Sequence, residues 1–209
     1  MKDVQFVARG RLGWEQWKLG DAILACSVLA DLGDVRLHVE NPDTAGNKLL
    51  WDLSSKVFND KYNLEIVQRK DAVPVVHPDQ YFLENNLSVV RYALPTGIGA
   101  DNEYVTTQSR SRAASRSVSY AMIDQFIEPD MKRIDLNQSE GSLSLPDLFN
   151  LVGAASKHVG AASGICWVAM STLTQTMCLM PSSFRHGSKG WDYALECMYR
   201  SPSITIKDL

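Results

Sequence analysis

Three short segments carry residue types that could bind or transform an anionic ligand. The first is Lys18-Leu-Gly-Asp21, where Gly20 would let a ligand approach the backbone and Asp21 could accept a proton from a hydroxyl group. Aspartate is also among the residues that best cap a helix N-terminus. For this segment alone, a purely structural role of Asp21 is therefore the stronger interpretation.

The second segment, Gln108 to Ser119, places three arginines among serines: Arg110, Arg112 and Arg116. Guanidinium groups and hydroxyls that follow a strand directly are suited to bind phosphate. A solvated surface loop would have the same composition. Both interpretations of this segment stay open.

The third segment is Val159-Gly-Ala-Ala-Ser-Gly164, which precedes a helix expected from Ile165. Small residues there expose backbone amides, and the helix dipole adds partial positive charge at the same point. Small residues also permit tight helix packing. The order of strand, glycine loop and helix over Val159–Pro181 nevertheless predicts a site for an anion such as a diphosphate.

The composition is that of a globular protein and excludes few partners. The 209 residues are 45% hydrophobic and 22% charged, with a net charge of -3, and no apolar run is long enough to cross a bilayer. No secretory signal is recognisable at the N-terminus, so we expect a cytoplasmic protein. The four cysteines lack CxxC spacing, which predicts buried free thiols: Cys26, Cys166, Cys178 and Cys197.

Apolar periodicity predicts alternating strands and helices in the first half of the chain. The expected strands are 4–8, 35–39 and 64–67, and the expected helices are 21–32 and 49–58. Residues 70–99 contain three prolines and indicate only short strands and loops. Pro95 to Asn102 has the composition of a linker, which places a domain boundary near residue 100.

The second half shows the same alternation. The expected strands are 104–108, 131–136, 158–160 and 176–180, and the expected helices are 120–127, 144–155, 165–173 and 191–200. The Ser144-Leu-Pro-Asp147 segment has the pattern of a capped helix start. We therefore predict an α/β protein with one Rossmann-like half over 1–100 and another over 101–209.

Two motifs resemble the heptosyltransferase-like group of GT-B glycosyltransferases. The first is Leu19-Gly-Asp-Ala-Ile-Leu-Ala-Cys-Ser-Val-Leu-Ala-Asp-Leu32, which is similar to the family's glycine-aspartate helix. The second joins Ser144-Leu-Pro-Asp-Leu-Phe-Asn-Leu-Val-Gly-Ala-Ala155 to His158-Val-Gly-Ala-Ala-Ser-Gly164, which is similar to the family's helix, strand and sugar-donor loop. The motifs span about a third of the chain, and the fold that they imply is two trimmed Rossmann-like halves with a cleft between them.

The resemblance implies an inverting, metal-independent sugar transfer from a nucleotide diphosphate sugar to a hydroxyl acceptor. By the resemblance Asp21 is the catalytic base, in an acceptor-side half over 1–100, and the half over 101–209 binds the nucleotide sugar. The residues that would contact the sugar donor are Arg110, Arg116, Ser163 and Gly164. The residues that would lie on the acceptor side are Gly20, Trp14 and Trp17. An ordinary core role for either tryptophan is at least as strong an interpretation. No metal or cofactor is implied, because amides and cationic side chains would neutralise the leaving diphosphate.

The sequence departs from the family pattern at two positions. Ala162 stands where the family commonly has an aspartate, and Trp167 where it has a histidine. A binding module for nucleotides or nucleotide sugars that has lost turnover is therefore the alternative function. A phosphotransferase is a third, but no GxxxxGK[ST] phosphate loop occurs.

The acceptor is left open between a saccharide and DNA. The small size suggests a compact genome, so a phage enzyme that acts on hydroxymethylated DNA bases in the host cytoplasm is one hypothesis. Arg110, Arg112 and Arg116 support it and the negative net charge opposes it.

Overall fold

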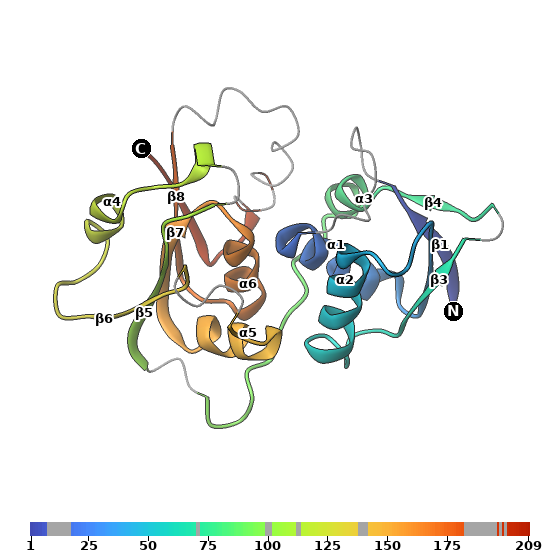
Figure 1. The fold of residues 1–209 in the computed structure, drawn as a ribbon, viewed down its shortest axis with the longest axis horizontal. Helices are drawn as coiled ribbons and strands as arrows, with labels where there is room; N and C mark the ends of the chain where they lie inside the picture. The colour runs from blue at the N-terminus through green and yellow to red at the C-terminus, as the bar shows by residue number, and fades with distance from the viewer. Residues whose placement is uncertain are drawn as a thin grey trace. The chain divides into compact units, whose positions relative to one another are not determined.

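The computed structural model describes most of the chain as two compact units, Met1–Val90 and Arg91–Leu209 (Figure 1). The described residues are 1–7, 18–69, 72–98, 102–111, 114–137, 142–181, 196, 198 and 200–209. No helix among them is both long and apolar enough to span a membrane. The boundary near residue 100, and the acceptor and donor roles of the two halves, stay predictions.

The first unit is a four-stranded parallel sheet with helices after three of its strands. Its elements are β1 (Lys2–Phe6), α1 (Leu19–Leu32), β2 (Val35–Val39), α2 (Ala45–Lys56), β3 (Leu64–Gln68), β4 (Val75–Val76) and α3 (Pro78–Glu84). The strand order is β3-β2-β1-β4, and every pairing is parallel. The predicted βαβαβ order is thereby confirmed for this half.

Helix α1 is the central helix of this unit. All residues from Ala22 to Leu29 are buried, because α1 packs beside both α2 and α3. Ser27 is the polar residue in this buried stretch, and its hydroxyl donates to Ile23 O at 2.9 Å and accepts from Val90 N at 3.0 Å. A satisfied hydroxyl can be buried without the cost of an unpaired polar group.

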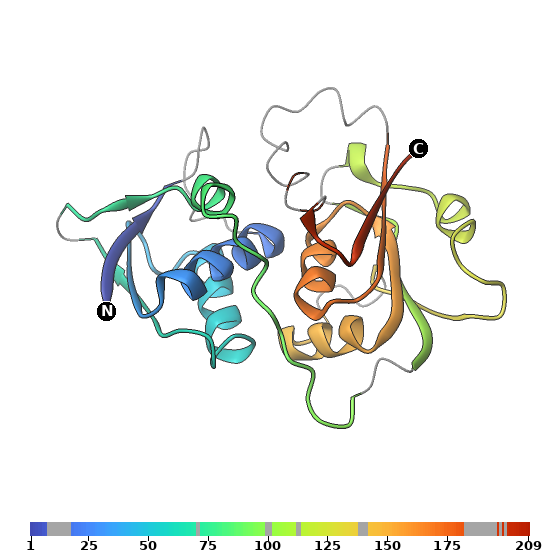
Figure 2. The ribbon, with the colours of Figure 1, turned by 180° about the vertical axis from the view of Figure 1, so that it is seen from behind.

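The sheet of the first unit carries its helices on one side (Figures 1 and 2). Parallel sheets are usually covered on both faces, but here no described helix lies on the second face. That face carries polar side chains in register across three strands, where Arg36 pairs with Asp3 and Glu65. His38 Nε2 lies 2.8 Å from Asp3 Oδ1 on the same face. Charged side chains thus replace an apolar cover.

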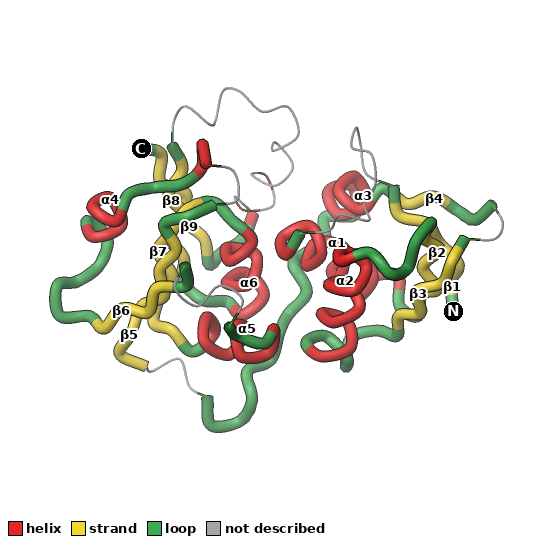
Figure 3. The backbone as a smooth tube through the Cα atoms, in the orientation of Figure 1, coloured by secondary structure: helices red, strands yellow, loops and turns green. Residues whose placement is uncertain are grey.

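The second unit is a five-stranded parallel sheet. Its elements are β5 (Asn102–Gln108), a short 3-10 helix η2 (Ala114–Arg116), α4 (Tyr120–Asp124), β6 (Lys132–Asp135), α5 (Leu145–Gly153), β7 (Ala155–Ala161), α6 (Gly164–Thr172), β8 (Thr176–Met180) and β9 (Ile204–Asp208). The order is β6-β5-β7-β8-β9, again with only parallel pairings. Figure 3 shows the alternation of strands and helices along this unit.

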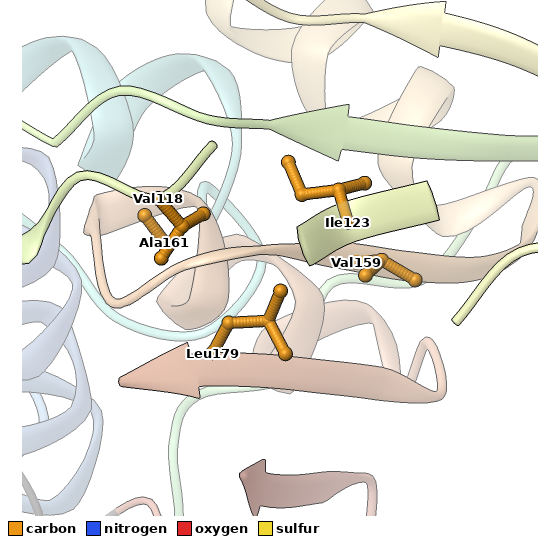
Figure 4. Close-up of a cluster of buried hydrophobic side chains, with 5 residues drawn as sticks. All are labelled: Val118, Ile123, Val159, Ala161 and Leu179. Atoms are coloured by element: carbon orange, nitrogen blue, oxygen red, sulfur yellow. The ribbon is translucent and has the colours of Figure 1, made fainter. Parts of the chain in front are cut away.

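Both faces of this second sheet are covered. Helix α4 lies on one side, and α5 and α6 lie on the other (Figure 1). On the α4 side a buried cluster joins the sheet to the segment 118–123 (Figure 4). Its members are Val118, Ile123, Val159, Ala161 and Leu179. Alternate strand residues therefore face the opposite side, toward α5 and α6.

Several expected elements differ from the structure in extent. Helix α2 begins at Ala45, four residues before the expected Leu49, because Thr44 caps it by accepting from Asn47 N at 3.2 Å. The strand expected as an edge over 158–160 is β7, a seven-residue strand between β5 and β8. Strand β9 and helix α3 were not expected. The helix expected over 191–200 lies mostly outside the described residues.

Candidate functional site

The second unit reverses its strand order between β5 and β7. The chain goes from β5 to β6 on one side and then crosses to β7 on the other. In open α/β sheets, ligands bind outside the carboxyl ends of the strands at such a switch point. Gln108 ends β5 and Ala161 ends β7, so the loops that follow these two strands flank the expected ligand position.

The loop after β5 folds back on itself. Val118 N donates to Ser109 O at 2.9 Å, and Ser111 N donates to Ser117 Oγ at 3.0 Å. Arg112 lies outside the described residues. The closed loop holds the half-buried Arg116 next to the carboxyl end of the sheet.

Hydrogen bonds connect this loop to the loop after β7. Both the Ser111 hydroxyl, at 3.1 Å, and Arg116 Nη1, at 3.3 Å, donate to Ala162 O. The hydroxyl of Ser163 donates to Oε1 of Gln108, the last residue of β5. The structure therefore brings Arg116 close to Ser163 and Gly164, although Arg116 and Gly164 are 48 residues apart in the sequence.

Ser163 also begins helix α6. Its backbone is extended, with φ -150 and ψ -179, and its Oγ accepts from Ile165 N at 3.2 Å. Ser163 O accepts from Cys166 N at 3.2 Å. First-turn amides have no carbonyl in a preceding turn of their own helix to bond. Ser163 accepts from Ile165 N and Cys166 N but not from Gly164 N. The first turn of α6 contains no acidic residue, so its dipole is not neutralised by a carboxylate.

Arg110 is exposed and lies at the root of the same loop. Its backbone N–H donates to Asn137 Oδ1 at 3.1 Å, while Asn137 Nδ2 donates to Ser109 Oγ at 3.0 Å. Asn137 and Gln108 are thus structural supports of the site that the sequence reasoning missed. The available signal was their position, since both are polar residues that follow or end a strand at the carboxyl edge.

The two departures from the family pattern are core residues in this structure. Ala162 is fully buried and only 4% of Trp167 is exposed. Ala162 takes part in the site through its backbone carbonyl. Trp167 lies in α6 and is buried, so a mostly apolar indole stands in place of the family's histidine.

The first unit has its own switch point between β1 and β4. Asp21 lies in the first turn of α1, half-buried, and the helix cap is Lys18, which makes no side-chain capping bond. The interpretation of Asp21 as the helix cap is therefore wrong. Gly20 is the second residue of the helix. Trp14 and Trp17 lie outside the described residues.

His77 is a further polar residue at this edge. It directly follows β4, and its Nδ1 lies 2.8 Å from the carbonyl oxygen of Val7, the residue directly after β1. A carbonyl can only accept, so Nδ1 carries the proton and a neutral imidazole would have its lone pair on Nε2. Sequence reasoning missed His77 because residues 70–99 gave no clear element to place it on. Among the described residues, no group of three or more His, Cys, Asp or Glu side chains could hold a metal ion.

Comparison with known proteins gives matches in structure but not in sequence. No family model and no curated protein matches the chain. A family 9 glycosyl transferase from Veillonella parvula superposes with a TM-score of 0.63 at 10% identity, over 100% of this chain and 86% of that one. The ADP-heptose lipopolysaccharide heptosyltransferase II of E. coli gives 0.52 at 10%, over 99% and 90%. The chain has a heptosyltransferase-like GT-B fold.

The iron-containing dodecameric glycosyltransferase TibC of enterotoxigenic E. coli has the same fold. It gives a TM-score of 0.53 at 12% identity over 85% of this chain, and TibC has also been solved in complex with ADP-D-β-D-heptose. The chain spans 57% of the length of TibC. The resemblance in fold and the two parallel sheets expected from the sequence are thus confirmed.

Proposed function

We propose that this protein is a glycosyltransferase that moves a sugar from a nucleotide diphosphate sugar to a hydroxyl acceptor, with inversion and without a metal ion. One observation carries the proposal: the hydrogen-bonded frame at the switch point of the second unit. There Arg116 and the first turn of α6 converge on one loop, Ala162 to Gly164. An anion is the ligand that this frame fits.

The sugar-donor diphosphate would lie at the start of α6. Gly164 N–H would donate to it, and Arg116 and Arg110 would supply positive charge. Fixed donors of this kind stabilise charge that develops on a leaving group without having to reorganise. In this structure the Ser163 hydroxyl already bonds Gln108 and Ile165, so a bond from Ser163 to phosphate would require its rotation away from Gln108.

Asp21 would act as the base in the first unit. It would take the proton of the acceptor hydroxyl as that oxygen bonds to the anomeric carbon and the bond from this carbon to the diphosphate oxygen breaks. Attack opposite to the leaving group gives inversion. His77 would bind the acceptor through Nε2, since Nδ1 is held by Val7 O, and Gly20, Trp14 and Trp17 would complete the acceptor side.

The acceptor is proposed as a saccharide hydroxyl, with hydroxymethylated phage DNA as the second hypothesis. Of the three arginines that favour DNA, Arg110 is exposed, Arg116 is engaged with Ala162 O, and Arg112 lies outside the described residues. An enzyme acting on DNA would have to reach the base in the major groove or flip it out. Retarded migration of hydroxymethylated DNA, weakening as salt is raised, would support the DNA hypothesis.

A non-catalytic binding module is the alternative function. The buried Ala162 and Trp167 favour it, because they leave the sugar-donor loop without the family's carboxylate and imidazole. Such a module would keep nucleotide binding and show no turnover of the sugar donor.

Calorimetry against UDP-, ADP- and GDP-sugars tests the proposal. We expect saturable binding of at least one of them, with Kd below about 1 mM. Absence of binding to every nucleotide sugar would contradict the proposed enzyme. Hydrolysis of the bound donor by the wild type but not by Asp21→Ala would support the enzyme, whereas binding without any turnover would support the module. Turnover that survives Asp21→Ala would retain the class of enzyme and remove the base.

A further inference from the structure

Two thiols and an imidazole lie together in the second unit, between its sheet and helix α6. They belong to Cys166 in the first turn of α6, Cys178 in β8 and His158 in β7, and none of the three is exposed to solvent. Neither cysteine forms a disulfide in this structure. The proposed function uses none of these side chains.

Strand register places the three groups on the same face. Cys178 pairs with Gly160 of β7, and Leu179 pairs with Ala161. Because Leu179 and Ala161 belong to the cluster on the α4 side, Cys178, Gly160 and His158 face α6. Cys166 Sγ lies 3.6 Å from Ala161 O, which brings its thiol down onto the same strands.

The absence of a side chain at Gly160 provides the space. A Cβ atom at this position would lie 3.1 Å from His158 Nε2 and 2.6 Å from Gln108 O. The second distance is too short for any real Cβ atom. The imidazole is held from the other side by Thr106 Oγ1, which lies 3.1 Å from Nδ1.

The two thiols are unequal in acidity. The neighbouring Cys178 thiol, and then His158, hold the pKa of the Cys166 thiol well below its usual value. The neighbouring Cys166 thiol and burial raise the pKa of Cys178, and the charge of Arg116 acts against this rise. Cys166 is thus the more acidic of the two thiols, and Cys178 is the second thiol that could resolve its oxidised form.

Cys26 in the first unit shows what a solitary buried cysteine does. Burial raises the pKa of its thiol to about 12, and its hydrogen-bonding neighbours are Tyr62 and Ser54. It therefore has the low reactivity of a structural cysteine.

We propose that Cys166 and Cys178 form a reversible disulfide that controls the loop Ala162–Gly164, and so regulates the sugar-donor site. This inference rests on the proposed function for its consequence, but not for the bond itself. With hydrogen peroxide as the oxidant, the Cys166 thiolate attacks one oxygen, the O–O bond breaks, and hydroxide leaves and takes up a proton as water. Cys178 then attacks the resulting sulfenic acid, the S–S bond forms, and a second water leaves with the thiol proton.

The bond would act on the loop through the first turn of α6. Cys166 N donates to Ser163 O, and Ile165 N donates to Ser163 Oγ, so a shift of Cys166 toward β8 changes the cap of the helix. A disulfide also fixes the distance between the two Cα atoms within about 4.4–6.8 Å. Loss of the cap would disturb Gly164 N and the contact of Arg116 with Ala162 O.

The bond is tested on the full chain treated with hydrogen peroxide and then with a thiol reductant. We expect the intact mass to fall by two hydrogen atoms, peptide mapping to join Cys166 to Cys178, and reductant to reverse both changes. Cys166→Ser and Cys178→Ser should each abolish the joined peptide, and Cys166→Ala and Cys178→Ala repeat the test should a serine variant fail to fold. Cys26→Ser is the matched control, and in this variant the peptide that joins Cys166 to Cys178 should still form. A folded protein whose two thiols stay unlinked, or link to other cysteines, overturns the proposal.

The regulatory effect has two readouts. Amide hydrogen exchange of Ser163–Cys166 should be faster in the oxidised protein, and the affinity for whichever nucleotide sugar binds the reduced protein should fall about tenfold, or about 1.4 kcal/mol. If the disulfide changes neither the amide exchange nor the affinity, the proposed regulation of the sugar-donor site is wrong. If no nucleotide sugar binds the reduced protein, the proposed function fails, while the mass and exchange measurements still decide the present inference.

Discussion

The two helices that follow the switch-point strands, α1 and α6, begin in opposite ways. Helix α6 is capped by a serine side chain and has no acidic residue in its first turn, whereas α1 has no side-chain cap and carries Asp21 in its first turn. A helix N-terminus attracts negative charge. At α6 that charge can come from a ligand, but at α1 the protein supplies its own carboxylate.

Under the proposed function, this difference would separate the two chemical tasks of a sugar transfer. The start of α6 would hold and release the diphosphate, and the carboxylate at the start of α1 would take a proton from a neutral hydroxyl. Substitutions at the two helix starts should therefore have different effects.

The largest effect is expected for Asp21→Asn. The change keeps the shape and removes the base, so the rate of sugar transfer should fall by about 10²–10⁴-fold. Affinity for the sugar donor should stay the same, because the anion is assigned to α6. Steady-state kinetics and calorimetry measure the two quantities.

The control for Asp21→Asn is Asp52→Asn on α2, a half-buried residue whose carboxylate pairs with Lys56. It should change neither quantity. Asp21→Asn could instead lower the affinity for the sugar donor as much as it lowers the rate. That result would contradict the assignment of the base to the start of α1 and of the sugar donor to the start of α6.

Arg116→Ala should change the affinity for the sugar donor, the quantity that Asp21→Asn leaves the same. Removal of a charge-assisted contact worth roughly 1.5–3 kcal/mol would weaken binding of the nucleotide diphosphate sugar about ten- to a hundredfold. Arg133→Ala, which removes an arginine paired with Asp124 in the same unit, is the matched control. Equal affinities of the two variants, measured by calorimetry, would exclude Arg116 from the site.

The serine caps of α5 and α6 offer a smaller and sharper test. Ser144 accepts from Asp147 N and Ser163 from Ile165 N, so each change to alanine should cost about 0.5–2 kcal/mol in the free energy of unfolding. Only Ser163→Ala should also alter affinity for the sugar donor. Urea denaturation and calorimetry on both variants provide the comparison. An identical effect of both variants on binding would mean that Ser163 is only a cap.

The sequence predicted the alternation of strands and helices because long apolar stretches have clear periods. It indicated β4 only as one of the short strands of residues 70–99, because β4 has two residues between prolines, and it missed β9, a short strand after a segment of weak pattern. It placed the start of α2 late because the first turn is polar and only the Thr44 cap marks it. Local pattern weakens where tertiary contacts decide the element.

The candidate site was only partly predictable for a topological reason. Residue types could mark Arg116 and Ser163 as phosphate ligands, but only the strand order shows that β5 and β7 are neighbours. The same holds for Gln108, whose partner Ser163 is 55 residues away, and for His77, whose partner Val7 is 70 residues away. The local sequence marks such side chains only by their position at the carboxyl end of a strand and does not identify their partners.

The smallest effect concerns the charged sheet face of the first unit. A hydrogen bond with His38, and then the charge of Arg36, hold the pKa of Asp3 below its unperturbed value of 3.8. The folded state thus favours the carboxylate, so its stabilisation is present above the unfolded pKa and is lost as the pH falls through the lower folded pKa. Asp3→Asn should therefore lower the urea midpoint of unfolding slightly at pH 7 and leave this midpoint unchanged at a pH below both pKa values.

The Glu128–Lys157 pair provides the comparison in the second unit. Hydrogen bonds from Lys157 lower the pKa of Glu128, so Glu128→Gln should show the same sign of pH dependence. Asp3 contacts both Arg36 and His38 on one face of the sheet, whereas Glu128 pairs with one lysine. A network of charges should contribute more to stability than an isolated surface pair, which contributes little. A larger shift for Glu128→Gln than for Asp3→Asn would show that the open face of the first sheet does not depend on its charges.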